Sequence, residues 1–424
     1  MKSSKKISLC VMLLSFLFIV SSCGGQGEVA DYQDDTENKT TITFFGNKYE
    51  PENVSVIEEI ISDFMAENPD IRVSYESLKG NDYFDALYKR MAAGKGDDVF
   101  MVNHDAVLEL SEKGQLADLS GLATISNYTD QMLSQMKEGE KIYWVPTTIS
   151  AFGLYCNLDL LKEHDQKVPE NLAEWEKTCD YFVEKGITPI IANNDISLKT
   201  LAIGESFYEL YQKDQQREVF DKLNDGKENL GKYLNSGFSL AEEFISRGYI
   251  DREKALNTEK TSDDLTEFVK GESPFMLTGA WAAGRVEGMK PEFEFQVAPY
   301  PVLKDQSLVV INADTRLSVN ADSEHQDAAM KLVEFFSRAE NIQKFADQQS
   351  SLSPLKGGKP STVEEIQPLV SCYEKGRIVI GADGLLNLPI WELTREASLQ
   401  MLSGKSLKET MAFMNRQAEE GREN

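Results

Sequence analysis

The chain has 424 residues, with 44 Lys and Arg against 70 Asp and Glu, which gives a formal net charge of −26. That balance excludes a nucleic-acid binder that works by releasing phosphate counterions, and it argues against a chain that lies along an anionic membrane surface. Hydrophobic residues make up 41% of the chain, including 21 Phe, 15 Tyr and 4 Trp, which is enough for one large core or two medium ones. The composition therefore indicates a folded, acidic, soluble body.

The N-terminal segment resembles a bacterial lipoprotein signal peptide. Basic residues precede the apolar run 7–20, which is shorter than the ~20 residues that span a bilayer. Small residues then lead to Cys23 in an arrangement similar to a lipobox, which implies that Cys23 carries a diacylglycerol on its sulfur and becomes the mature N-terminus. A plain secretory signal with an incidental cysteine is the alternative. The polar stretch 24–39 is typical of a flexible tether.

Between the tether and residue 102, strands and helices alternate. We predict strands at 41–45, 71–75 and 99–102, separated by a helix that ends before Asn68-Pro69 and by a helix over 82–93. The run 99–102 is apolar throughout, as expected for a strand covered on both faces. Strands that alternate with helices of this length favour right-handed crossovers and a mainly parallel sheet.

The alternation resumes further along the chain. We predict a strand at 153–157, a helix at 172–185 that begins with a capping box formed by Asn171 and Glu174, and a strand at 189–192. Residues 198–267 are rich in helix patterns and charges.

The last part returns to strands before it ends in helices. Strands are expected at 275–277, 295–298 and 308–311, followed by a helix at 327–336 and by mainly helical structure from 354 to 414.

Cysteines and histidines do not form a recognisable site. Apart from the signal and the anchor, only Cys156, Cys179 and Cys372 remain, an odd number without a Cys-x-x-Cys pair. We expect buried thiols, with one disulfide plus a spare thiol as the alternative. The three histidines lie far apart and no phosphate-binding glycine motif is present, so we expect no metal and no cofactor.

Several blocks together resemble the extracellular solute-binding proteins (family 1) of bacterial sugar ABC importers, a group that includes maltodextrin-binding protein. Examples are a helix that ends in Asn-Pro before an Ile-x-Val strand, and a Gly-x-Trp turn after a later strand. The resemblance runs from about residue 41 to residue 417. The blocks that carry it are 57–75, 94–115, 141–161, 168–190 and 271–285.

The resemblance implies an α/β, two-lobed, periplasmic-binding-protein-like fold. Each lobe would hold a mainly parallel sheet flanked by helices, with the ligand in a cleft at the carboxyl ends of the strands. The expected divisions are 1–22 signal peptide, 23–40 lipidated tether, 41–148 lobe 1, 149–306 lobe 2, 307–350 return to lobe 1, and 351–424 C-terminal helices mainly of lobe 2.

The same resemblance suggests ligand-binding residues. Trp281, in the Gly-x-Trp turn, and Trp391 match family positions that stack on sugar rings, although either indole could instead pack in the core. The polar candidates could alternatively be turn residues, hinge-packing residues or, for the arginine, a salt-bridge partner. These candidates are Asn47, Asn103, Asp105, Thr148, Ser150, Asn194, Asp195 and Arg316.

Two departures from the family pattern bear on the ligand. Residues 312–319 replace the Gly-Gly-rich turn that often precedes an Ala-Ile-Ser strand in the family. The loop 102–105 lacks the aromatic residue found there in maltodextrin-binding protein. The ligand therefore need not be a maltodextrin.

The resulting functional expectation is a binding protein rather than an enzyme. It would be held on the outer face of the cell membrane by its lipid anchor alone, would capture a sugar or oligosaccharide, and would deliver it to the permease subunits of an ABC transporter. We expect a monomer and no nucleic-acid partner. The alternatives are a ligand-binding receptor for a membrane sensor kinase and, with no catalytic motif to support it, a secreted glycan-acting enzyme.

Overall fold

The structure is a computed structural model that describes residues 39–359 and 361–423. The predicted signal peptide, Cys23 and nearly all of the tether lie outside the described residues. Within the described part of the chain, no helix combines the length and the apolar character needed to cross a membrane.

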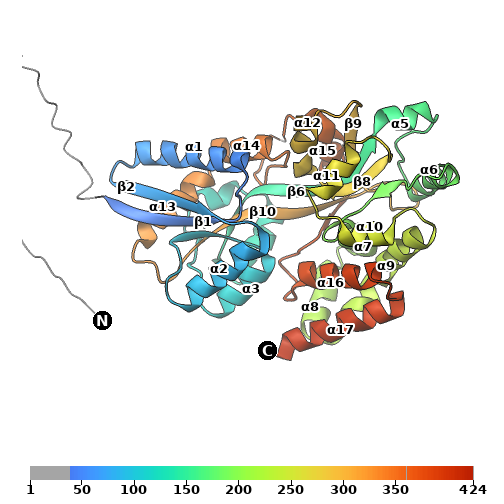
Figure 1. Cartoon of the computed structure of the whole chain (residues 1–424). Helices are drawn as coiled ribbons and strands as arrows, with labels where there is room; N and C mark the ends of the chain where they lie inside the picture. Colours follow the sequence, from blue (N-terminus) through green and yellow to red (C-terminus); the bar gives the residue numbers. More distant parts are fainter. Residues whose placement is uncertain (1–38, 360, 424) are drawn as a thin grey trace, which may run out of the picture. The chain divides into compact units, whose positions relative to one another are not determined.

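The framework is one continuous sheet of nine strands (Figure 1). Its order is β2-β1-β3-β10-β6-β8-β7, with β11 paired to β10 and β9 paired to β6. The strands are β1 Thr40–Gly46, β2 Ile71–Ser77, β3 Val99–Val102, β6 Val145–Asn157, β7 Ile190–Ile191, β8 Phe275–Gly279, β9 Phe295–Ala298, β10 Val309–Val319 and β11 Ile378–Ile380, and a separate pair consists of β4 Lys137–Glu138 and β5 Lys141–Ile142.

Parallel pairing holds at both ends of the sheet and between β10 and β11, whereas the long central strands pair antiparallel. β1 is parallel to β2 and β3, and β7 is parallel to β8. The long strands β6 and β10 run antiparallel to each other, and β10 is antiparallel to β3 while β6 is antiparallel to β8. The predicted strands 153–157 and 308–311 were therefore too short: both β6 and β10 continue through the middle of the sheet and join its two ends.

We call the end that holds β1, β2 and β3 the first lobe. Its helices bury the faces expected from their spacing; α1, for example, buries Ile57, Ile60, Ile61 and Phe64. A fully buried aliphatic or aromatic side chain stabilises the fold by about 1.5–3 kcal/mol relative to an exposed one. The helices here are α1 Pro51–Glu67, α2 Gly80–Ala92, α3 His104–Glu112, α13 Gln326–Phe336 and α14 Ala339–Gln348, and η1 Ala123–Asn127 and α4 Asp130–Met136 precede β4.

We call the end that holds β7 and β8 the second lobe. Its helices α7 (Ser197–Gln212) and α9 (Leu230–Ser246) pack closely, and a Cβ added at Gly237 of α9 would lie 2.1 Å from the carbonyl oxygen of Ala202 in α7. The C-terminal helices α16 and α17 pack against α7 and α9, as Figure 1 shows. The remaining helices are α5 Leu158–Glu163, α6 Leu172–Glu184, α7 Ser197–Gln212, α8 Gln216–Asn224, α9 Leu230–Ser246, α10 Arg252–Asn257, α11 Asp263–Phe268, η2 Ala280–Ala282, α12 Ala283–Gly288, η3 Glu364–Ile366, α15 Gln367–Glu374, α16 Ile390–Leu402 and α17 Leu407–Glu423.

Two local predictions can be compared directly with the structure. Asn171 caps α6 by accepting a hydrogen bond from the Glu174 amide at 3.1 Å, while the Glu174 carboxylate accepts from the Glu170 amide and the Asn171 side chain. Cys156, Cys179 and Cys372 are buried with free thiols, which confirms the interpretation of these cysteines as small buried hydrophobes.

Candidate functional site

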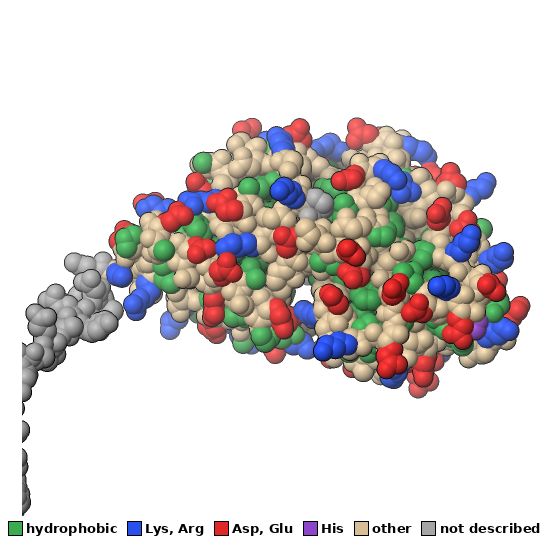
Figure 2. Space-filling view, turned by 90° about the horizontal axis from the view of Figure 1, so that it is seen from above, with side chains coloured by type: hydrophobic (Ala, Val, Ile, Leu, Met, Phe, Trp, Pro, Cys, Tyr) green, Lys and Arg blue, Asp and Glu red, His purple; other side chains and the backbone are tan. Residues whose placement is uncertain are grey.

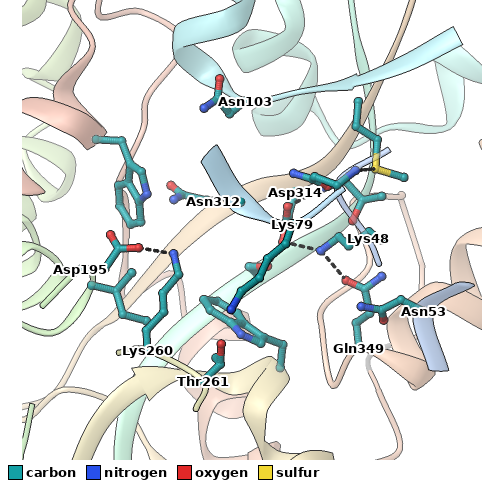
Figure 3. A pocket seen from close by; sticks show the side chains of 18 of the residues that line it. Lys48, Asn53, Lys79, Asn103, Asp195, Lys260, Thr261, Asn312, Asp314 and Gln349 are labelled. Carbon is teal, nitrogen blue, oxygen red and sulfur yellow. Dashed lines mark hydrogen bonds and ion pairs between the residues drawn. The ribbon is translucent and has the colours of Figure 1, made fainter. Parts of the chain in front are cut away.

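A cavity of about 1420 Å³ lies between the two lobes, above the middle of β6 and β10. Loops of the first lobe supply one side of it, and the starts of α7, α12 and α16 supply the other. Figure 3 shows Lys48, Asn103 and Asp195 around the cavity, with Asn312 and Asp314 on the long strand. The ends of several parallel strands thus meet at one site, the usual position of a ligand in an open α/β sheet.

Three aromatic side chains form a wall on the side of the second lobe. The ring of Phe152 lies 5.2 Å from that of Trp281 and 5.3 Å from that of Trp391, measured between centroids. Gly279 makes room for one indole, since a Cβ there would lie 2.0 Å from the Trp281 ring. We call Phe152, Trp281 and Trp391 the aromatic wall.

An ion cluster lies beside this wall at the start of α7. The Lys199 ammonium is 2.6 Å from the Asp195 carboxylate and 4.2 Å from the centroid of Trp391, and Lys260 pairs with the other Asp195 oxygen. Burial lowers the pKa of Lys199 to about 8, although Asp195 opposes that change. Burial alone would raise the pKa of Asp195, but the two ammonium groups hold it well below its usual value. Asp195 is therefore a charged, fixed acceptor at the cavity wall.

The first lobe and β10 supply a second wall of a different kind. It contains buried polar atoms that make no hydrogen bond to any described residue, and all of their residues line the cavity. A buried polar group without a partner costs about 1–3 kcal/mol, so such atoms persist where water or a ligand completes them. We call this the polar wall; its unpartnered atoms are Asn47 Oδ1, Asp105 Oδ1, Thr315 Oγ1, Gln348 Oε1 and Gln349 Nε2.

Asp105 and Arg316 are two charged residues on this side. Burial, together with the nearby Glu392 carboxylate, raises the pKa of Asp105 to about 6, against the opposing effect of Lys199 and Arg316. The Arg316 side chain lies over the Trp144 ring at 4.2 Å, and its Nε donates to the Ala313 carbonyl at 3.0 Å. Arg316 is only 4% exposed, and its guanidinium makes no ion pair with any described residue. Its terminal nitrogens remain available to a ligand.

A strained backbone position lies within this wall. Thr315 has φ of 45°, the left-handed region that a β-branched residue rarely adopts. In a regular strand alternate side chains face opposite sides, yet Asp314, Thr315 and Arg316 all line the cavity. The left-handed residue thus lies within a continuous stretch of β10, residues 312–316, that lines the cavity.

Asp314 is held firmly within that set. Its carboxylate accepts from the Ser150 hydroxyl at 2.6 Å and from the Thr315 amide at 2.6 Å, and the Lys48 ammonium lies 3.5 Å away. Burial would raise the pKa of Asp314, but Lys48, these donors and Arg316 lower it below its usual value. Lys48 also donates to Gln349 at 3.0 Å, which links the carboxylate to the end of α14 (Figure 3).

The structure brings most of the predicted site residues together. Asn103 both lines the cavity and caps α3 by accepting from the Ala106 amide, so the turn interpretation and the cleft position hold together. Asn194 lines the cavity while its side chain donates to the Leu256 carbonyl. The predicted residues on the cavity wall are Asn47, Asn103, Asp105, Ser150, Asn194, Asp195, Trp281, Arg316 and Trp391.

Thr148 is the exception and requires a correction. It is fully buried in β6 and does not line the cavity. It precedes Ser150 by two residues on the same face, so it lies about 7 Å further along the strand, beneath the first lobe. Position on the crossover was not enough to place its hydroxyl at the site.

Sequence reasoning missed several members of the site. Phe152 follows Ser150 by two residues in β6, and Asp314 precedes Arg316 by two in β10, so knowledge of the full strands would have found both. Lys199 lies four residues after Asp195, a helical ion-pair spacing that was visible in the sequence. Lys260 and Gln349 come from distant loops and gave no local indication. Among the described residues, no group of three or more His, Cys, Asp and Glu side chains is arranged to hold a metal ion.

Comparison with known proteins gives a consistent result. The sequence model of the family described as "Bacterial extracellular solute-binding protein" matches residues 47–343. The chain is 26% identical over 386 residues to the multiple sugar-binding protein of Streptococcus mutans, covering 87% of each chain. It is 23% identical over 347 residues to the putative ABC transporter periplasmic-binding protein YcjN of Escherichia coli, covering 78% of this chain and 76% of the relative.

A solved structure shares the fold. The solute-binding protein RafE in complex with raffinose superposes with a TM-score of 0.70, covering 89% of this chain and 98% of that one, at 24% sequence identity. The expected two-lobed α/β fold is thereby confirmed.

Proposed function

We propose that this chain, which belongs to the bacterial extracellular solute-binding protein family, captures a neutral sugar or oligosaccharide in the cavity between its lobes and delivers it to an ABC transporter permease. The observation that carries the proposal is the pairing of an aromatic wall with a facing set of unpartnered polar atoms in one cavity.

Sugar chemistry matches both walls. A sugar ring presents an apolar C–H face, which the exposed faces of Trp281 and Trp391 can cover, and a rim of hydroxyls. Each hydroxyl is both a donor and an acceptor, so it can donate to the Asp105 or Asn47 oxygen and accept from Arg316 or the Gln349 amide. Both kinds of contact are satisfied at once only when the ligand lies between the walls.

The size and charge of the cavity narrow the ligand class. At about 1420 Å³ the cavity exceeds the ~300–1,000 Å³ of ordinary small-molecule pockets, which favours an oligosaccharide. Basic and acidic side chains line it in nearly equal numbers, although the whole chain has a formal net charge of −26. Most of these charges are paired with each other, as in Lys199–Asp195, Lys48–Asp314 and Arg395–Glu392. This balance favours a neutral ligand.

A thermal-shift screen tests the proposal. Neutral oligosaccharides such as raffinose, maltotriose and stachyose would be compared with a uronate-containing oligosaccharide of similar length. A ligand that binds only the folded state stabilises it by ~2.7 kcal/mol at one hundred times its Kd, so a neutral binder should raise Tm in a concentration-dependent way. Protection by the uronate alone would contradict neutrality, and no protection by any carbohydrate would contradict the function.

Delivery from the membrane surface is the second part of the proposal. The relative YcjN is described as a binding protein of an ABC transporter, and the sequence places a lipobox-like cysteine before a polar tether. Two acyl chains on Cys23 would anchor the protein stably, at ~0.8 kcal/mol per buried CH₂. Cys23→Ala should release the protein into the medium; normal processing with retention on carbonate-washed membranes would contradict the anchor.

We further propose that binding leaves the ligand chemically unchanged. The matched family consists of binding proteins, and the cavity carboxylates Asp195 and Asp314 are each paired with a cation. Oligosaccharides incubated with the protein should be recovered intact. Cleavage products above those of a heat-killed sample would overturn this part.

A further inference from the structure

Two ion pairs join the lobes at the mouth of the cavity. The Arg285 guanidinium of α12 lies 2.7 Å from the Glu50 carboxylate, which precedes α1 in the first lobe. The Lys79 ammonium, just before α2, lies 2.9 Å from the carboxylate of Glu259, in the loop between α10 and α11. All four residues line the cavity. Each pair thus connects a first-lobe loop to a second-lobe segment.

The Glu50 carboxylate is held in place and ionised by its surroundings. Its other oxygen accepts from the Asn53 side chain at 2.7 Å, and its side chain is 21% exposed. Although burial would raise the pKa of Glu50, Arg285 and these hydrogen bonds lower it, so the group stays ionised near neutral pH. Dissolved salt weakens the ion pair of a partly buried, hydrogen-bonded carboxylate less than it weakens the ion pair of an exposed one.

The position of Arg285 links this pair to sugar binding. Arg285 follows Trp281 by four residues, about one helical turn, in the short segment η2–α12. Holding Arg285 against the first lobe therefore also holds the Trp281 indole across from the polar wall. Lys79 connects the lobes at a second place. Figure 3 shows its side chain extending toward the segment that carries Lys260 and Thr261.

We propose that Glu50–Arg285 and Lys79–Glu259 form an electrostatic clasp across the mouth of the cavity, which draws the lobes together without ligand and positions Trp281 over the bound sugar. The inference rests on the proposed function for the identity of the ligand. The clasp itself is a property of the free protein, so it can be tested even if no sugar binds.

The molecule offers a matched control. Arg338 and Glu67 form an ion pair of the same two residue types at 2.9 Å, but both lie on the first lobe, at the start of α14 and the end of α1. Charged side chains of both signs are interspersed over the surface in Figure 2, so a change of one charge alone is a small perturbation. Glu67→Gln removes one carboxylate, as Glu50→Gln does, without touching the mouth of the cavity.

The first test is X-ray scattering of the ligand-free protein at low and high ionic strength. The Debye length falls from ~30 Å at 0.01 M to ~3 Å at 1 M salt, so a clasp should weaken and the radius of gyration of the wild type should rise with salt. Glu50→Gln should already show the larger radius at low salt. Glu67→Gln should behave as the wild type does.

The second test is calorimetric titration with the best oligosaccharide of the panel. Glu50→Gln should bind about two- to fivefold more weakly at low salt, with a reduced salt dependence. The charge-swapped double variant Glu50→Arg with Arg285→Glu should recover both the affinity and the compact radius, which a merely structural role of either residue would not allow.

A wild-type radius and affinity in Glu50→Gln at low salt would overturn the clasp. So would an equal effect of Glu67→Gln, because the response would then be to net charge. If no oligosaccharide binds the wild type, the proposed function fails, while the scattering series still decides whether the clasp exists.

Discussion

The two walls of the cavity are built on opposite plans. In the aromatic wall, Phe152 contacts both Trp281 and Trp391, and each indole lies against a glycine, so the surface is complete before a ligand arrives. In the polar wall, atoms such as Asn47 Oδ1 and Asp105 Oδ1 are buried and unpartnered.

The difference separates two tasks. A preformed apolar face gains affinity from area and water exclusion, with little dependence on which sugar lies on it. A wall of unpartnered donors and acceptors binds tightly only a ligand that forms hydrogen bonds with all of them, because each group left without a partner retains the free-energy cost of its burial. We therefore assign affinity mainly to the aromatic wall and discrimination between sugars mainly to the polar wall.

The largest expected effect comes from removing the centre of the aromatic wall. Trp281→Ala should weaken binding of every accepted oligosaccharide by at least tenfold, or ~1.4 kcal/mol, since a stacked indole also keeps water from neighbouring hydrogen bonds. Calorimetry on wild type and variant measures it, and Trp281→Phe should retain part of the affinity. If Trp281→Ala binds normally while still folded, this wall does not hold the sugar.

The next effect has opposite signs for stability and binding. Asp105 has a pKa of about 6 in the folded state, above the ordinary value of 3.8, so the unfolded chain loses this proton at a lower pH than the folded protein does. Its contribution to stability is therefore lost as pH rises from about 4 to 6, and the full penalty remains at pH 7.

Asp105→Asn should remove that penalty and stabilise the ligand-free protein by about 1–2 kcal/mol at pH 7 but not at pH 4. It should also weaken binding several-fold and change the order of preference among sugars. Urea unfolding at both pH values measures the first effect. Asp85→Asn, exposed on α2 away from the cavity, is the control and should change neither. Equal stabilisation at both pH values would contradict the assignment.

The smallest effect concerns the strain that shapes the polar wall. Thr315→Gly should stabilise the fold by about 0.5–1 kcal/mol, because glycine adopts φ of 45° without the cost to a β-branched residue, less its own entropy cost. Binding should weaken only by the loss of one hydroxyl. Lys290→Gly, at φ of 55° in a turn outside the cavity, is the matched control. Destabilisation by Thr315→Gly alone would mean that the side chain, not the backbone, matters there.

Each wall was predicted from the sequence in part, with Phe152 missed in the aromatic wall and Gln348 and Gln349 missed in the polar wall. Trp281 was identifiable from the Gly-x-Trp turn of the family resemblance, and Trp391 from its match to a second family aromatic. The carboxyl ends of predicted strands likewise gave Asn47, Asn103 and Asp195. Local patterns therefore reached the residues that directly follow a recognised strand.

The features that could not be predicted from the sequence depend on contacts between residues far apart in the chain. Gln349 reaches the cavity from the end of α14 and Lys260 from the loop after α10, and neither has a neighbour in sequence that marks it. Thr315 has a left-handed backbone in β10, between β3 and β6, against the preference of a β-branched residue. The same long-range pairing extended β6 past Pro146, where the sequence suggested only a crossover.

The most direct test of the two-wall account is a crystal structure with the oligosaccharide that gives the largest thermal shift. We expect a sugar ring stacked on Trp281, with hydroxyl oxygens within about 3.2 Å of Asp105 and of the terminal nitrogens of Arg316. A sugar that contacts the aromatic wall while Asp105 and Arg316 stay unpartnered, or one bound outside this cavity, would contradict it.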